Sequence, residues 1–192
     1  MNWRRPMEHE CAGYFTRYTM YVHEDNALEV LKASKYNSIG LMSTLSLTDW
    51  DHRYADGKWS VKEVWVHILD TERIFAYRML RIGRGDQTPL PGFEQDEYII
   101  PSEANHRTVA SIISEYEAVR NNTISLIENL PVSAFDRMGT ASENPISCRA
   151  FAFIIAGHEL HHLKVLRENY KISKFGSDYT RLLDPRSNTY AK

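Results

Sequence analysis

Hydrophobic residues recur at steps of three and four positions along four long segments, which is the period of amphipathic α-helices. The first segment covers residues 26–48, and Asp25 or Asn26 is placed to cap its first turn. Its apolar stripe has one polar interruption and consists of Leu28, Leu31, Lys35, Ile39, Met42 and Leu45.

The second segment has the most clearly marked start. Ser60 and Glu63 are three residues apart at the beginning of an apolar run, which is the spacing of a capping box. This signature predicts a helix that begins at Val61, continues to about Ile82 and ends at Gly83.

The third and fourth segments cover residues 107–130 and 147–170. Asn105 or His106 lies at the start of the third segment, and Pro131 stops it. The inward stripe of the fourth segment consists of Phe151, Ile154, Ile155, His158, His162, Val165 and Leu166. Two histidines are therefore expected to point in the same direction as core residues.

These helices predict an all-α four-helix bundle, because strand signals are weak along the chain. The link between the second and third helices has about 24 residues, and at about 3.3 Å per residue it can exceed the length of a helix. It can therefore return along the bundle and make those two helices parallel. We expect one domain over residues 1–192, with the bundle at 26–172, an aromatic-rich packing segment at 1–25 and a polar tail at 173–192.

Composition narrows the classes of partner. The formal net charge is -2 and no block of like charge occurs, so neither nucleic acid nor a membrane is an expected partner. The longest apolar run, at 150–157, is much shorter than the roughly 20 residues of a membrane span. The two cysteines make no disulfide framework and the N-terminus lacks the apolar part of a secretory signal, so we expect a reducing, cytoplasmic location.

His158 and His162 are four residues apart, which places both imidazoles on one face of a helix, one turn apart. Pairs at this spacing can share a metal ion, and they also occur as half-buried polar residues. His67 favours the metal hypothesis, because it lies on the inward face of the second helix and one cation would satisfy all three imidazoles. Such ligands suit zinc or nickel, with iron or manganese as alternatives, whereas magnesium and calcium prefer oxygen ligands.

The stretch GHELHHLKVL (157–166) also contains the H-E-x-x-H pattern of zincin-type proteases, in which Glu159 would be the general base. The extended form of that pattern needs a glycine and a third histidine where this chain has Val165 and Glu168. A protease is therefore the weaker hypothesis.

Four further residues carry open alternatives. Asp70 and Glu159 are the candidate catalytic residues: Asp70 could orient a ligand, take a proton or act as a fourth ligand, and each could instead be a solvated or interhelical carboxylate. His161 is expected to line the pocket or support the structure. Arg78 is expected to form an ion pair within the bundle, and contact with an anionic substrate is the alternative.

Three stretches, in this order, resemble the DinB/YfiT superfamily of metal-binding four-helix bundles. The family's second helix, with its first metal histidine at His67, resembles KWSVKEVWVHILDTERIFAYRMLRIGRGD (58–86). The loop that follows resembles LPGFEQDEY (90–98). The family's last helix resembles AGHELHHLKVLRENY (156–170), so that its H-x-x-x-H falls on His158 and His162.

The resemblance implies an up-down-down-up bundle, a three-histidine site for zinc, nickel or a similar ion, and a homodimer. The activities that it implies are transfer of low-molecular-weight thiols, such as bacillithiol or mycothiol, and metal-dependent hydrolysis. We therefore expect an enzyme on small molecules, in which a divalent metal activates a thiol cosubstrate or water against an electrophile. The alternative is a non-catalytic, small-ligand-binding bundle with a structural metal, which a fourth protein ligand would usually close.

Overall fold

The computed structural model describes residues 3–176, so most of the expected tail at 173–192 lies outside the described residues. In chain order the elements are the 3-10 helices η1 (Glu8–Glu10) and η2 (Gly13–Phe15), the helices α1 (Thr16–Thr19), α2 (Ala27–Thr44), α3 (Leu47–Asp51), α4 (Val61–Gly83) and α5 (Gln95–Ser102), then η3 (Ala104–His106), α6 (Val109–Asn129), η4 (Val132–Ala134), the strands β1 (Met138–Ala141) and β2 (Asn144–Ser147), and α7 (Cys148–Glu168).

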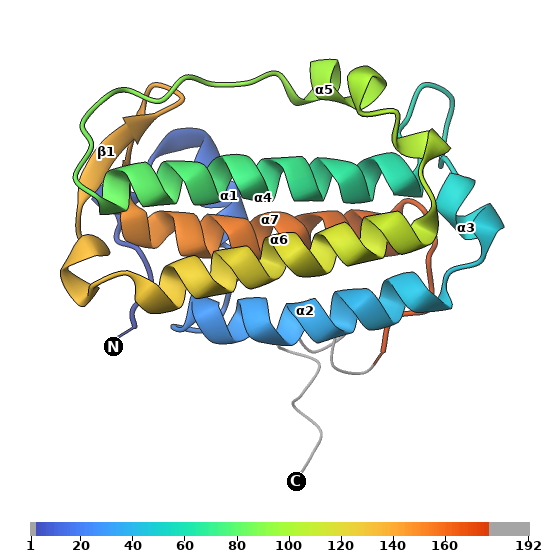
Figure 1. Cartoon of the computed structure of the whole chain (residues 1–192), viewed down its shortest axis with the longest axis horizontal. Coiled ribbons are helices and arrows are strands. Elements are labelled where there is room, and N and C mark those ends of the chain that lie inside the picture. The colour runs from blue at the N-terminus through green and yellow to red at the C-terminus, as the bar shows by residue number, and fades with distance from the viewer. Residues whose placement is uncertain (1–2, 177–192) are drawn as a thin grey trace, which may run out of the picture.

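Four long helices form the bundle, as predicted. In Figure 1, α2 and α7 run from left to right, whereas α4 and α6 both run from right to left. The order is therefore up-down-down-up, and α4 packs against both α6 and α7. The segment between α4 and α6 returns along the outside of the bundle and contains the short helix α5 (Figure 1). None of the described helices is long and apolar enough to cross a membrane.

Side-chain caps set the starts of the long helices. The capping box of α4 is formed: the Ser60 hydroxyl accepts from the amide of Glu63, and the Glu63 carboxylate accepts from the amide of Ser60. Asn26, and not Asp25, caps α2. The cap of α6 is Thr108, two residues after His106. Asn105 is not available because its amide donates to Glu63 and its oxygen accepts from the Ser60 hydroxyl.

The predicted stripe of α2 was also wrong in the middle of the helix. Ser34 and Ser38 are the buried residues there, whereas Lys35 forms an ion pair with Glu117 at the edge of the helix. The two hydroxyls face the bundle because they donate to the buried carboxylate of Glu159. A polar partner across the bundle therefore outweighs the hydrophobicity of neighbouring positions.

A β-hairpin closes one end of the bundle, although no clear strand signal is present in this part of the sequence. Strands β1 and β2 pair antiparallel, and Ser142 and Glu143 between them have φ of 48° and 65°. A two-residue hairpin turn with positive φ usually contains Asn or Gly, so this one has no recognisable signature. Leu90 in the crossover also pairs with Ala141, which fixes the crossover to this end of the bundle.

The N-terminal segment packs closely against α7. Gly157 makes this approach possible, since a Cβ atom at that position would lie only 1.9 Å from the backbone oxygen of Tyr18. The approach brings the Tyr18 ring to within 5.1 Å of the imidazole of His158, measured between ring centroids. The glycine at the start of the GHELHHLKVL stretch therefore has a packing role.

Candidate metal centre

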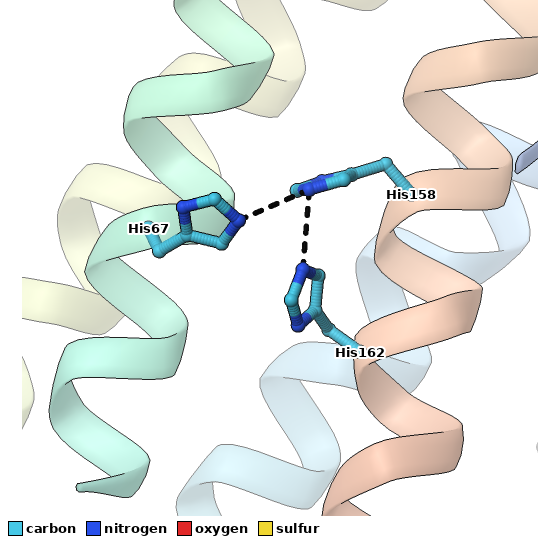
Figure 2. A group of neighbouring side chains, drawn as sticks. All are labelled: His67, His158 and His162. Atoms are coloured by element: carbon cyan, nitrogen blue, oxygen red, sulfur yellow. Dashed lines mark hydrogen bonds between the residues drawn. The ribbon is translucent and has the colours of Figure 1, made fainter. Parts of the chain in front are cut away.

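Three histidines from two helices converge inside the bundle. His67 comes from α4, and His158 and His162 come from α7 (Figure 2). The Nε2 atom of His158 lies 3.1 Å from Nε2 of His67 and 3.2 Å from Nε2 of His162. His67 and His158 are each only 3% exposed, and His162 is half-buried. The grouping predicted from the sequence is therefore present.

The three imidazole rings cannot fully satisfy one another's hydrogen-bonding groups. Each Nε2 atom carries either one proton or one lone pair. Nε2 of His158 contacts both neighbouring nitrogens, so it cannot form a separate, well-directed hydrogen bond with each of them. A cation at the point of convergence would accept all three lone pairs at once.

The spacing of the nitrogens fits such a cation. Tetrahedral zinc with Zn–N bonds of about 2.0–2.1 Å places its nitrogen ligands about 3.3 Å apart. Two of the separations here are 3.1 and 3.2 Å, and all the ligand atoms of the group lie within 4.8 Å of one another. Among residues 3–176 the group consists of His67, His158 and His162, with no carboxylate or thiol. These donors match zinc, nickel or a similar ion.

Burial keeps the histidines in the form that binds metal. The pKa of His67 is lowered to about 4 by burial and, to a smaller extent, by the charge of His161. Burial also brings the pKa values of His158 and His162 well below 6.5, and the neighbouring histidines add to the shift. All three imidazoles are therefore neutral at pH 7, with lone pairs free for coordination.

Neighbouring side chains orient the rings. The Thr71 hydroxyl lies 3.4 Å from Nδ1 of His67, so that Nδ1–H can donate to it while Nε2 keeps its lone pair. Trp59, just before the start of α4, places its ring 4.8 Å from the His67 ring, and Tyr18 meets the His158 ring in an edge-on contact. Thr71 was not singled out from the sequence, although its place one turn after His67 is a usable signal.

Two cavities border the histidines. One, of about 390 Å³, is lined by His158 together with residues of the N-terminal segment, α4 and the crossover. The other, of about 530 Å³, is lined by His162 together with Trp59, Tyr170 and residues of α5. Asp96, at the start of α5, lines both cavities. The centre can therefore be approached from two sides.

The structure does not bring Asp70 to the histidines. Its carboxylate is half-buried and lies 3.7 Å from the guanidinium of Arg73. Burial raises the pKa of Asp70, and the nearby charges belong to Arg73, Glu115 and Arg107 at the contact with α6. Asp70 is therefore an interhelical carboxylate and not a fourth ligand, because its side of α4 faces α6.

His161 also lies outside the group. Its Nδ1 atom is 3.1 Å from the hydroxyl of Tyr21, and its ring packs against Tyr18 and Tyr21. It supports the packing of the N-terminal segment on α7, in agreement with the structural role expected for it.

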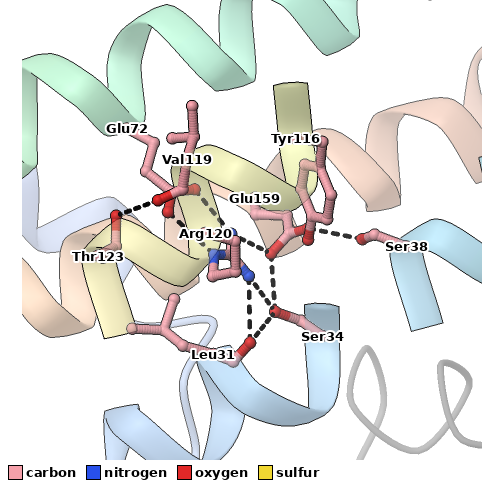
Figure 3. A network of polar contacts seen from close by, with 9 residues as sticks. All are labelled: Leu31, Ser34, Ser38, Glu72, Tyr116, Val119, Arg120, Thr123 and Glu159. Atoms are coloured by element: carbon pink, nitrogen blue, oxygen red, sulfur yellow. Dashed lines mark hydrogen bonds and ion pairs between the residues drawn. The ribbon is translucent and has the colours of Figure 1, made fainter. Parts of the chain in front are cut away.

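Of the two alternatives for Glu159, the structure favours the interhelical carboxylate over the general base, because its side chain points toward residues of α2 and α6 (Figure 3). It is 1% exposed, and its carboxylate accepts hydrogen bonds from Ser34, Ser38, Tyr116 and Arg120 at 2.6–2.9 Å. No acceptor position is left for a reactant. The zincin hypothesis fails for this reason, because its glutamate must face the metal.

Arg120 completes this buried network. It is 0% exposed and donates to both carboxylate oxygens of Glu72, at 2.9 and 2.8 Å, as well as to Glu159. Burial alone would raise the pKa of Glu159, but Arg120 and the hydroxyl donors hold it below its usual value. The network joins α2, α4, α6 and α7, and we interpret it as structural.

Known proteins share sequence and fold with this chain. A curated protein of Oceanobacillus iheyensis, named "Putative metal-dependent hydrolase OB0413", is 26% identical over 124 residues, which are 64% of this chain and 70% of that protein.

Solved structures show the same fold. YfiT from Bacillus subtilis, described as a probable metal-dependent hydrolase with an unusual four-helix bundle topology, aligns with a TM-score of 0.63 and 14% identity over 88% of this chain and 93% of its own. The DinB-like protein YjoA from Bacillus subtilis aligns with a TM-score of 0.54 and 16% identity, over 76% of this chain and 90% of its own.

The family itself is established by sequence. The profile of the DinB superfamily matches residues 31–166, a span that begins in α2 and ends in α7, and so includes most of the four-helix bundle and all three histidines. With the up-down-down-up helix order and the histidine site both in place, the chain belongs to the DinB superfamily.

Proposed function

We propose that this protein is a metal-dependent enzyme on small molecules, in which a divalent ion held by His67, His158 and His162 activates a low-molecular-weight thiol or water against an electrophile. The observation that carries the proposal is the convergence of three neutral nitrogens, without a carboxylate or thiol in the group, at the border of two cavities. A fourth protein ligand, which would close a structural site, is not part of the group among the described residues.

The residues of the chain have separable tasks in this proposal. The three imidazoles hold the ion without neutralising its charge, and Thr71 keeps His67 in the tautomer that presents Nε2. A bound dication supplies Lewis acidity, which lowers the pKa of a thiol or water beside it and polarises an electrophile. The aromatic rings of Trp59 and Tyr18 restrict water around the two buried histidines.

Thiol transfer is favoured over hydrolysis by the shape of the site. Two cavities of about 390 and 530 Å³ border the same histidines, and a transfer reaction needs room for a thiol and for an electrophile. The names of the relatives favour water as the nucleophile, so both reactions belong in the test. Zinc and nickel are the proposed ions because all three ligands are imidazoles.

Metal analysis of the purified protein tests the site directly. We expect about one divalent ion per chain in the wild type and a loss of at least about 100-fold in metal affinity in His67→Ala. Removing a residue that only hydrogen-bonds to a metal ligand already costs about 10- to 100-fold in metal affinity, and losing a ligand itself should cost at least as much. His161→Ala is the matched control: it removes a neighbouring imidazole that bonds to Tyr21, and it should keep the ion. Equal metal content in wild type and His67→Ala would refute the three-histidine site.

Activity is then tested with the metal-loaded protein against two panels, one of thiols with electrophiles and one of esters and amides. Turnover in either panel that disappears in His67→Ala supports the enzyme. Stoichiometric metal with no turnover in both panels would favour a ligand-binding protein with a structural ion.

A further inference from the structure

Arg78 is a buried guanidinium that has no carboxylate partner within the described part of the chain. It is 3% exposed, and its Nη2 atom donates a hydrogen bond to the backbone oxygen of Pro91, at 2.6 Å. No ion pair of Arg78 occurs among residues 3–176, so the interhelical ion pair expected from the sequence is not formed. Burial lowers the pKa of Arg78, and no acidic group opposes that shift.

Arg120 has the carboxylate partners that Arg78 lacks among the described residues. Both guanidiniums are buried, but Arg120 meets the carboxylates of Glu72 and Glu159, which hold its pKa above the ordinary value although burial acts in the opposite direction. A buried charge without a partner is strongly disfavoured, so it needs a ligand or a solvated cavity beside it. Arg78 has such a cavity, since it lines the same 390 Å³ space as His158.

The cavity connects Arg78 with the histidine centre along one face of α4. Thr71, Phe75 and Arg78 line it at steps of four and three residues, and Thr71 contacts His67. From Thr71 to Arg78 the helix rises about 10 Å. The rings of Phe75 and Phe93 each lie 5.8 Å from the guanidinium carbon and flank the charge.

We propose that this cavity binds the anionic end of an elongated substrate, with Arg78 binding its carboxylate while its reactive end reaches the three histidines. The inference rests on the proposed function only for what happens at the histidines. A carboxylate fits better than a phosphate, because one guanidinium faces the cavity and two exposed acidic residues, Glu94 and Asp96, also line it and disfavour a dianion.

Matched probes test the assignment by binding, without turnover. The zinc-loaded wild type is titrated by calorimetry with 6-mercaptohexanoate and with 6-mercaptohexanol, which share the thiol and the chain and differ in the charge at the far end. Homologues with three and eight carbons cover other distances. At the best length we expect the acid to bind at least about tenfold more tightly than the alcohol, as for a hydrogen bond to a charged group.

Variants identify the arginine. Arg78→Met should abolish the preference for the acid and leave the affinity for the alcohol unchanged, and Arg78→Lys should retain part of it. Arg17→Met is the matched control, since Arg17 is an exposed guanidinium 3.5 Å above the ring of Tyr14 at the same cavity. Thermal melts check that each variant is folded. If Arg78→Met does not fold, the wild type and Arg78→Lys still decide.

Three outcomes would overturn the proposal: equal affinity for acid and alcohol in the wild type at every length, an acid preference that persists in folded Arg78→Met, or one that disappears in Arg17→Met instead. Displacement of the acid by less inorganic phosphate than acetate would refute the carboxylate assignment. Hexanoate and hexanol, titrated into the zinc-free protein, separate this inference from the proposed function. If the preference for hexanoate depends on Arg78 but thiol binding does not depend on zinc, Arg78 is confirmed as the carboxylate-binding residue. The same result would refute activation of the thiol by the metal.

Discussion

His158 and Glu159 are neighbours on α7, yet they belong to two different kinds of polar site. His158 contacts two other imidazoles that cannot satisfy it, and it borders a cavity. Glu159 has four hydrogen-bond donors around its carboxylate and lines neither of the two cavities. Successive helical residues point about 100° apart, so one helix can serve both sites.

The difference shows how a functional cluster can be told from a structural one in this bundle. Both clusters are buried and both join α4 to α7. In the network of Glu159 and Arg120 both charged groups are hydrogen-bonded to partners, whereas the converging Nε2 atoms of His67, His158 and His162 cannot all be paired with one another. Arg78 belongs with the second group by the same criterion. The incomplete groups are those that have cavities beside them.

Removing the carboxylate from the matched network should have the largest effect. Glu159→Ala leaves Arg120 with one of its two buried carboxylates, and we expect a loss of about 3–5 kcal/mol in the free energy of unfolding. Denaturant titration of the metal-free protein measures it, and Glu159→Gln is the isosteric control. Zinc affinity of the folded variant should stay close to the wild-type value. A variant with unchanged stability and lost zinc affinity would place Glu159 at the metal after all.

Acid should act first on the histidine cluster. Because the folded-state pKa of His67 is about 4, below the unfolded value near 6.5, the unfolded chain binds the proton first as pH falls. His67 therefore stabilises the fold above pH 6.5, and this contribution is lost between pH 6.5 and 4, at about 1.4 kcal/mol per pH unit. Stability of the metal-free protein, measured from pH 7 to 4.5, should have a shallower slope in His67→Ala. Parallel slopes would contradict the assignment.

The close contact between Tyr18 and α7 predicts a smaller effect. Gly157→Ala places a methyl group against the backbone oxygen of Tyr18, and we expect a loss of about 1–3 kcal/mol in unfolding free energy. Gly40→Ala is the matched control on an exposed face of α2, where a Cβ meets no atom within 4 Å, and it should stabilise the protein by about 0.5–1 kcal/mol. If both substitutions stabilise the protein, the close approach of the N-terminal segment is wrong.

The smallest expected change tests the orientation of His67. Thr71→Val removes the hydroxyl near Nδ1 and keeps the shape of the side chain, so zinc affinity should fall by about tenfold. Thr71→Ser keeps the hydroxyl and should bind zinc nearly as well as the wild type. Competition with a chelator measures both. An equal loss in Thr71→Ser would indicate a packing effect in place of the hydrogen bond.

Particular elements show how far the sequence could be interpreted. The capping box at Ser60 located the start of α4 correctly, because both of its hydrogen bonds are made within one helical turn. The hairpin at β1 and β2 was missed, since its turn residues carry no local signal. The stripe of α2 was misplaced because Ser34 and Ser38 are buried by a carboxylate more than a hundred residues away. The expected homodimer and the cytoplasmic location stay predictions.

The sequence by itself determined the four helices and the inward direction of His67, His158 and His162, through local periodicity. It also determined, through its length, the link that allows α4 and α6 to be parallel. These features depend on spacing along one helix or on chain length, both of which can be counted from the sequence. Only the tertiary structure decided that Glu159 meets Arg120, and that Arg78 meets a cavity in place of a carboxylate. The reason is that a buried polar group is defined by its partner, and here the partners come from other helices.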